Sequence, residues 1–318
     1  MSARGPASRH LGLDLGGTNI KWAVVERDAD AWRSLDRDQV ATPAADGPDA
    51  VVRRLATVGA EAVGRNPGVS SVGIGIPGLY DPVAGTTRLL VNFPGDWAGV
   101  PVASRVGTAL GLPAALINDA RAFGLAELRL GAGRGASSMI GITLGTGVGG
   151  VIAIDGHVHQ GHDGTAGEIG HLTIEPDGPW CNCGNRGCLE AFARADQIAA
   201  ACGTATAEEG VARARAGDAR AADGLAQVGR YLGIGVADLI TLITPDRIVI
   251  GGGVSAAGDL LTAPIWAEIR RRVRVTSLDE VEIVTAELGT WAGAIGAAIH
   301  GADAAGRRDA AARTATVG

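Results

Sequence analysis

The feature that most constrains the fold is a pattern that occurs twice along the chain. Residues 11–16 and 140–145 both read apolar, Gly, apolar, polar, Leu, Gly, and each copy runs into a glycine turn and a second apolar segment. Two apolar runs separated by a glycine turn predict a β-hairpin. One supersecondary unit used twice predicts two similar α/β lobes facing a cleft.

The chain length of 318 residues also favours two lobes over one core. We place the first lobe at 1–117, completed by a C-terminal helix within 291–318, and the second at 118–290, with a distinctive loop at 171–190. The hydrophobic periodicity predicts further strands at 72–76, 115–117, 246–250 and 282–288. It predicts helices at 49–63, 101–110, 120–130, 225–243, 260–273 and 291–300, with a frayed tail after Gly301.

Composition excludes several classes of protein. Apolar residues make up 46% and charged residues 19%, which is a globular and not a disordered profile. The net charge is −6 without a long Lys/Arg block, so no nucleic-acid surface is expected. Residues 1–10 lack the apolar core of a signal peptide, and no stretch of membrane-spanning length is free of charge and glycine. The cysteines do not form a secreted disulfide framework, so we expect a cytoplasmic protein without a membrane partner.

The segment from His171 to Glu190 contains a compact group of metal-binding residue types. Cys181, Cys183 and Cys188 lie within eight residues, and His171 precedes them. Three thiolates and an imidazole suit a tetrahedral Zn²⁺ site closed by four protein ligands, hence structural. Gly184 and Gly187 would let the loop fold back on the metal. The alternatives are that these thiols are merely buried, or that Cys202 replaces His171 as the fourth ligand.

Two other groups of polar residues are candidates for ligand binding. Glu168, His171 and Glu190 would offer acceptors and one metal-oriented donor, which is what a polyhydroxylated ligand needs. The alternative is that both glutamates are solvated surface charges. Asn118 and Asp119 follow a short apolar strand and precede a predicted helix, so either side chain could serve as an N-cap. A carboxylate at a helix N-terminus stays ionised, as a general base must, and we expect Asp119 to cap the helix.

Two matches to the dinucleotide-binding pattern G-x-G-x-x-G begin at Gly73 and Gly145. That motif requires a helix directly after the glycines, whereas strand or turn residues follow here. The sequence contains no P-loop motif either. Backbone amides of the two glycine turns could nevertheless hold a triphosphate, because no Cβ blocks the approach.

Taken together, several segments resemble the ROK family of sugar kinases and repressors over nearly the whole chain. The motifs are Asp14-Leu-Gly16-Gly17-Thr18-Asn-Ile-Lys21, Ile76-Pro77-Gly78, Asn118-Asp119-Ala, Leu144-Gly145-Thr146-Gly147-Val-Gly149-Gly150, Gly167-Glu168-Ile-Gly170-His171 and Cys181-x-Cys183-Gly-x-x-Gly187-Cys188-x-Glu190. The cysteine signature combined with Glu-x-x-His is the most specific of these.

The resemblance implies an α/β protein with the two-lobed actin-like ATPase/hexokinase (ribonuclease H-like) fold, which uses ATP, Mg²⁺ and structural Zn²⁺. It assigns Asp119 as the catalytic base that takes the proton from a sugar C6 hydroxyl. The sugar would be held by Gly78, Asn118, Asp119, Glu168, His171 and Glu190. ATP would be held by Asp14, Gly16, Gly17, Thr18, Lys21, Gly145, Thr146, Gly147, Gly251, Gly252 and Gly253, with Asp14 near Mg²⁺.

The resemblance implies a homodimer or homotetramer acting on a small-molecule sugar. Glucose is the first expectation, with N-acetylglucosamine, N-acetylmannosamine and amino-sugars such as kanosamine as alternatives. Arg121 and Asn182 depart from the usual residues, and the first departure bears on specificity. The family also includes repressors, which carry a helix-turn-helix ahead of the first glycine turn. The position of Asp14 near the start of the sequence favours a kinase over a repressor. The presence of Asp14, Asp119 and both glycine turns argues against a sugar sensor without catalytic activity.

Overall fold

The computed structural model describes residues 7–29, 31–90 and 93–315 and divides into two compact α/β units. The first unit comprises Met1–Leu130, Gln160–Thr165 and Thr290–Gly318, and the second comprises Gly131–His159 and Ala166–Gly289. The boundary lies after 130 instead of after the expected 117, because helix α3 (Asp119–Leu130) packs against α9 (Ala292–Ala315). A Cβ on Gly296 of α9 would lie 1.7 Å from the carbonyl oxygen of Ala122 in α3, so the two backbones are in direct contact.

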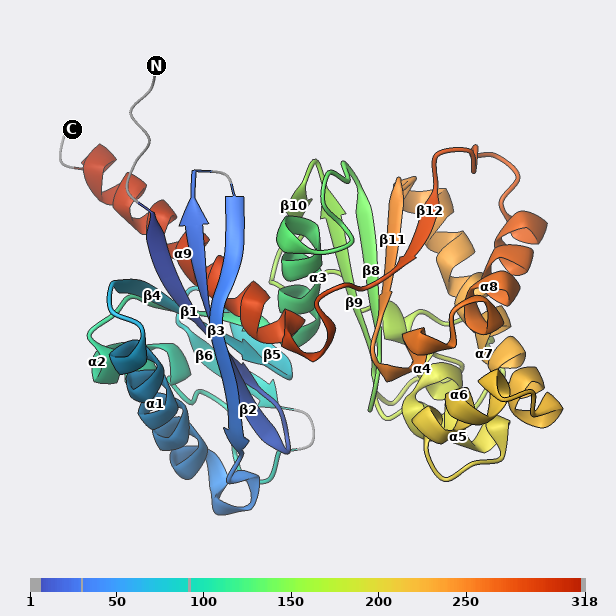
Figure 1. Cartoon of the computed structure of the whole chain (residues 1–318), viewed down its shortest axis with the longest axis horizontal. Helices are drawn as coiled ribbons and strands as arrows, with labels where there is room; N and C mark the ends of the chain where they lie inside the picture. Colours follow the sequence, from blue (N-terminus) through green and yellow to red (C-terminus); the bar gives the residue numbers. More distant parts are fainter. Residues whose placement is uncertain (1–6, 30, 91–92, 316–318) are drawn as a thin grey trace. The chain divides into compact units, whose positions relative to one another are not determined.

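The first unit is built on a five-stranded sheet in the order β3-β2-β1-β4-β7 (Figure 1). β1 pairs antiparallel with β2 and parallel with β4, and β4 pairs parallel with β7. The carboxyl ends of β1, β4 and β7 therefore meet at one edge of the sheet. The strands are β1 (Ser8–Leu15), β2 (Asn19–Asp28), β3 (Ala31–Ala41), β4 (Val69–Ile76) and β7 (Ala114–Asn118), and β5 (Gly78–Asp81) and β6 (Thr86–Leu90) form a separate hairpin.

Helices cover both faces of this sheet. α1 (Gly47–Arg65) and α2 (Val102–Leu110) pack on the face that carries Leu11, together with the short η1 (Ala44–Asp46). α9 lies on the opposite face, where a Cβ on Gly73 would come within 1.7 Å of the carbonyl oxygen of Ala297. Gly73 is thus needed for close approach of a helix to the sheet, and not for binding a dinucleotide. The expected fraying after Gly301 is wrong, because α9 continues to Ala315 and Arg308 donates to the carbonyl of Ala114.

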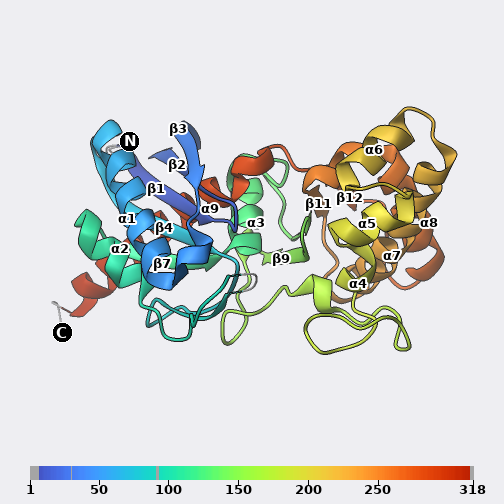
Figure 2. The same ribbon diagram turned by 90° about the horizontal axis from the view of Figure 1, so that it is seen from below.

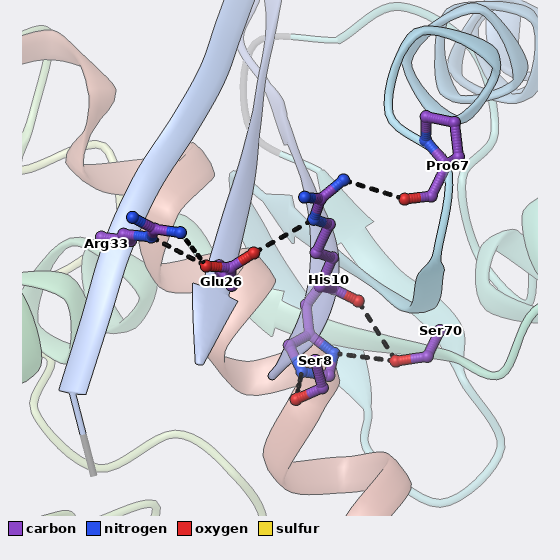
Figure 3. Close-up of polar contacts among 7 residues, drawn as sticks. Ser8, His10, Glu26, Arg33, Pro67 and Ser70 are labelled. Atoms are coloured by element: carbon purple, nitrogen blue, oxygen red, sulfur yellow. Dashed lines mark hydrogen bonds and ion pairs between the residues drawn. The ribbon is translucent and has the colours of Figure 1, made fainter. Parts of the chain in front are cut away.

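Polar contacts fasten the amino end of β1 to its neighbours (Figure 3). Glu26 accepts from Arg9 at 3.1 Å and from Nε of Arg33 at 2.8 Å, and these bonds hold the pKa of Glu26 below its usual range. The buried ring of His10 contacts the hydroxyl of Ser71 at 2.8 Å. Burial lowers the pKa of His10 to about 4, with a smaller effect from Arg27, so this histidine is neutral. The group lies at the opposite end of β1 from Asp14 and fixes strand pairing.

The second unit repeats the sheet topology of the first in the order β10-β9-β8-β11-β12. β8 pairs antiparallel with β9 and parallel with β11, as β1 does with β2 and β4. The two copies of the sequence repeat fall in the equivalent strands β1 and β8. The strands are β8 (Met139–Leu144), β9 (Val148–Ile154), β10 (His157–Val158), β11 (Arg247–Gly251) and β12 (Glu282–Thr285).

The helices of the second unit gather on one side of its sheet (Figure 2). They are α4 (Glu190–Ala193), α5 (Ala195–Cys202), α6 (Ala207–Arg215), α7 (Ala219–Ile243) and α8 (Asp259–Arg272), with the short η2 (Ile169–His171) and η3 (Gly253–Ala257). The short η4 (Gly289–Trp291) begins at the last residue of this unit and continues into the first. Among the described helices, α7 has the length and composition of a membrane span. Its side chains Leu225, Leu232 and Ile240, however, are buried in the core of this unit. It is the core helix of this unit.

The sequence patterns missed β3, the β5–β6 hairpin, β10, α4 and α6. β3 is an edge strand with mostly exposed side chains, so it lacks the apolar alternation that identifies strands. Strand β12 ends at Thr285, before the expected 288. Both G-x-G-x-x-G matches run into strands and not into helices: β5 begins at Gly78, the last glycine of the first match, and β9 begins at Val148, inside the second. The rejection of a dinucleotide-binding motif is therefore confirmed.

Candidate functional site

Asp14 lies near the carboxyl end of β1, where it pairs across the strand with Lys21 of β2. A Cβ on Gly75 of β4 would contact its carboxylate at 3.4 Å, and a Cβ on Gly293 would collide with it at 2.5 Å. Desolvation in this crowded position raises the pKa of Asp14 to about 7, and the charge of Asp119 adds to the rise, while Lys21 opposes it. Asp14 pairs with Gly75 of β4 and Gly75 pairs with Ile117 of β7, so Asp14 and Asp119 lie at the same edge of the sheet.

Asn118 and Asp119 occupy the end of β7 and the start of α3. The side-chain oxygen of Asn118 accepts the amides of Ala120 at 3.1 Å and Arg121 at 3.2 Å, which is the hydrogen-bond pattern of an N-cap. The expectation that Asp119 caps the helix is therefore wrong. Asp119 is the first helical residue, and its carboxylate accepts the adjacent amide of Ala120 at 2.8 Å.

Gly78 lies beside Asn118, whose side-chain nitrogen donates to the Gly78 carbonyl at 3.2 Å. Gly78 has φ +120°, and a Cβ there would lie 2.2 Å from the carbonyl oxygen of Leu89. Only glycine suits this left-handed and crowded position. The first unit thus gathers three of the residues predicted to bind sugar, Gly78, Asn118 and Asp119, close to Asp14.

The first glycine turn joins β1 to β2 and is closed by the bond from the Gly16 amide to the Asn19 carbonyl at 3.0 Å. Thr42, just beyond β3, holds the turn from outside: its hydroxyl donates to the Gly16 carbonyl at 2.7 Å and its amide to the Thr18 carbonyl at 2.9 Å. Gly17 and Thr18 remain exposed. Sequence reasoning missed Thr42, because only strand pairing brings it to the turn.

The second glycine turn and the triple-glycine segment meet in the second unit. Gly252 has φ +92°, and a Cβ on it would lie 2.0 Å from the carbonyl oxygen of Leu144, the last residue before the turn 145–147. Gly145 and Thr146 are exposed. A Cβ on Gly253 would contact Oε1 of Glu208 at 3.0 Å, which adds a carboxylate that the sequence did not indicate. The predicted ATP residues Thr146, Gly147 and Gly251–Gly253 therefore lie together.

The predicted metal ligands converge in the loop before α4. The ligand atoms of His171, Cys181, Cys183 and Cys188 all lie within 4.8 Å of one another. Nδ1 of His171 lies 3.8 Å from Sγ of Cys181, and the sulfurs of Cys183 and Cys188 are 3.7 Å apart. Ligands at Zn–S distances near 2.3 Å in a tetrahedron are separated by about 3.8 Å, so the group fits Zn²⁺. Burial raises the pKa of the Cys188 thiol to about 12, so a cation would be needed to hold it as a thiolate.

The alternative fourth ligand, Cys202, does not join this group. It lies in α5, and its sulfur donates to the carbonyl of Ala221 at 3.5 Å. Gly184 (φ +91°) and Gly187 (φ +69°) fold the loop back as expected. Pairing of Thr173 with Cys188 and of Trp180 with Arg186 closes it.

The second unit also contains the other residues predicted to bind sugar. Glu168 precedes η2, and its carbonyl accepts the amide of His171 at 3.0 Å. Glu190 begins α4; its Oε1 lies 3.8 Å from Sγ of Cys181, and its Oε2 accepts the amide of Val148 at 2.9 Å. His171 and Glu190 are thus joined through the cysteine loop.

The first unit also carries a groove of about 370 Å³ between residues 82–85, the end of α2 and Arg308. None of the predicted site residues lines this groove.

The comparisons with known proteins agree with this arrangement of motifs. The model of the ROK family matches residues 10–303. The chain belongs to the ROK family. It is 36% identical to a glucokinase of Thermotoga maritima over 312 residues, which cover 92% of this chain and 97% of the relative.

Two solved ROK structures share the fold over nearly the whole chain. A ROK hexokinase from Thermus thermophilus superposes with a TM-score of 0.81 at 35% identity and covers 94% of this chain and 99% of its own. A ROK family glucokinase from Streptomyces griseus, solved with glucose and AMPPNP, gives a TM-score of 0.79 at 33% identity, with 93% and 100% covered. The predicted α/β, actin-like ATPase/hexokinase fold is confirmed, with its two lobes corresponding to the two units.

Proposed function

We propose that this ROK protein is an ATP-dependent sugar kinase that phosphorylates the C6 hydroxyl of a hexose, with glucose as the preferred substrate. Its similarity over nearly the full length of a glucokinase that binds glucose and AMPPNP supports this proposal most directly. The proximity of Asp14 and Asp119 adds support, because phosphoryl transfer needs one carboxylate for the metal–nucleotide and another for the attacking hydroxyl.

The proposed reaction assigns a task to each of these groups. Asp119 accepts the proton of the C6 hydroxyl while the C6 oxygen of the sugar bonds to the γ-phosphorus. The bond between the γ-phosphorus and the β–γ bridging oxygen breaks at the same time, and ADP leaves with its electron pair. Gly78, Asn118, Glu168, His171 and Glu190 orient the sugar hydroxyls. Catalysis then consists mainly of positioning and charge neutralisation, without a phosphoenzyme.

The nucleotide is assigned to the two glycine turns and the triple-glycine segment. The turns 16–18 and 145–147 hold the phosphates through the amides of their exposed residues Gly17, Thr18 and Thr146, and Gly251–Gly253 lies under the adenosine. Asp14 suits Mg²⁺, a cation that prefers carboxylate oxygens and would neutralise charge on the phosphates. Lys21, opposite Asp14, adds positive charge beside the same turn.

We further propose that His171, Cys181, Cys183 and Cys188 bind one structural Zn²⁺, since the separations of their ligand atoms fit a tetrahedron. We also propose a homodimer or homotetramer, as the family resemblance implies. Light scattering at working concentration tests the assembly, and a monomer mass would refute it.

A phosphorylation assay over a sugar panel with ATP and Mg²⁺ tests the function. Glucose should give the highest kcat/KM, ahead of N-acetylglucosamine, N-acetylmannosamine and kanosamine, and Asp119→Asn should serve as the inactive control. A faster reaction with an amino- or N-acetyl sugar would support the proposed kinase function but replace glucose as the preferred substrate. Binding of sugar without any phosphorylation would favour a sugar-sensing protein such as a repressor.

A further inference from the structure

Glu190 contacts the second glycine turn directly, although its position in the cysteine motif assigns it to the sugar. Its Oε2 accepts the amide of Val148, the first residue of β9, at 2.9 Å. Val148 follows the turn 145–147 without an intervening residue. The bond therefore fixes the point at which the turn ends and β9 begins.

The shape of the turn is fitted to this carboxylate. A Cβ on Gly147 would lie 2.5 Å from Oε2 of Glu190, a separation that real Cβ atoms do not show. The φ of Gly147 is not positive, so alanine could adopt its backbone conformation. A side chain at 147 would therefore have to displace the carboxylate of Glu190 and with it the bond to the Val148 amide.

A second bond from the same segment holds the other end of the turn. The amide of Ala195, the first residue of α5, donates to the carbonyl of Gly145 at 2.8 Å. The short stretch from Glu190 to Ala195 therefore contacts the turn on both sides. Cys188 of the cysteine cluster lies only two residues before Glu190, so the metal loop and the turn share one rigid support.

We propose that Glu190 is a positioning residue for the phosphoryl donor: it holds the turn 145–147 in the conformation in which the exposed Thr146 presents its amide to phosphate. An amide bonded to a fixed side-chain acceptor suits a turn that must stay ordered before the nucleotide arrives. The part of this inference that concerns nucleotide affinity rests on the proposed kinase function. The part that concerns the order of the turn does not.

Amide hydrogen exchange at Val148 and the Kd of AMPPNP, both measured without sugar, test the proposal on two Glu190 variants. Glu190→Ala removes the acceptor, so exchange at Val148 should accelerate about 10-fold, the effect of one hydrogen bond, and the Kd of AMPPNP should rise. Glu190→Gln retains an acceptor oxygen and should keep exchange within about threefold of wild type. Glu175→Ala, an exposed residue of the same loop, is the matched control and should change neither.

A double-mutant cycle tests the fit between the carboxylate and the glycine. Gly147→Ala should weaken AMPPNP binding in the wild-type background and weaken it much less when Glu190→Ala is also present. Unchanged Val148 exchange in Glu190→Ala, or additive effects in the cycle, would overturn the proposal and leave Glu190 as a sugar ligand only. Faster exchange at Val148 in a protein that phosphorylates no sugar would reject the kinase function while keeping the positioning role.

Discussion

Asn118 caps the helix whose first residue is Asp119. The Asn118 oxygen accepts two amides of the first turn, those of Ala120 and Arg121, while the carboxylate of Asp119 accepts the amide that follows it. The structural task and the proposed chemical task are thus carried by adjacent side chains. Substitutions can therefore separate them.

Asp119→Asn should fold as wild type and still bind sugar but lose about 10² to 10⁴-fold in kcat, the usual value of general-base assistance. The variant keeps the shape of the side chain and leaves the Asn118 cap intact, so only proton acceptance and charge are lost. Steady-state kinetics, thermal melting and sugar titration measure the three properties. A variant that retained more than about a tenth of kcat would exclude Asp119 as the base and direct attention to Glu168.

Asn118→Ala should lower the free energy of unfolding by about 0.5–2 kcal/mol, because α3 loses its cap. Asn118→Ser is the matched control: its hydroxyl can cap the helix, but it cannot donate to the Gly78 carbonyl as the amide does. Chemical denaturation should therefore show Asn118→Ser close to wild type, while both variants bind sugar more weakly. Equal destabilisation of the two variants would show that the cap contributes little.

Asp14→Asn should abolish activity and change the pH dependence of stability. The pKa of Asp14 rises from 3.8 to about 7 on folding, so between these values the folded protein keeps a proton that the unfolded chain has lost. The free energy of unfolding of wild type therefore falls as pH rises from about 4 to about 7, and it stops falling above that range. Asp14→Asn has no carboxyl group to ionise at this position, so its free energy of unfolding does not fall in this way. The difference in free energy of unfolding between Asp14→Asn and wild type should therefore change in favour of the variant by up to a few kcal/mol between about pH 4 and pH 7.

Urea denaturation of both proteins at pH 5 and pH 8 measures this difference. Parallel changes in the two proteins would show that Asp14 is not desolvated in the folded state. The kinase reaction at low Mg²⁺ should also slow below about pH 7, because protonated Asp14 cannot accept the metal.

Cys188→Ser should remove most of the zinc and destabilise the second unit, since a structural metal contributes its binding energy to folding. Elemental analysis should give one zinc per wild-type chain and much less in Cys188→Ser. Thermal melting should show a lower melting temperature for Cys188→Ser than for wild type. Cys202→Ala provides the comparison, because its sulfur lies in the core of α5 and α7 and outside the metal group. Wild-type protein without zinc, or a zinc-free Cys202→Ala, would contradict the assignment.

The elements and residues that depend on short stretches of chain could be predicted from the sequence. The hairpins at β1–β2 and β8–β9 follow from a local repeat, and the group of His171 with Cys181, Cys183 and Cys188 follows from spacing within one loop. The exceptions were elements without an apolar pattern, such as β3 with its exposed side chains, and the extent of α9, whose last turns are rich in alanine and charge.

Only the tertiary structure decided which distant residues lie together. The proximity of Asp14 to Asp119 depends on the parallel pairing of β1, β4 and β7, and the bond from Val148 to Glu190 depends on how the cysteine loop packs against the second turn. Strand order and register are set by the burial of whole sheet faces and by helix packing, as when α9 crosses Gly12 and Gly73. Such contacts are summed over many residues, so no single motif in the sequence specifies them.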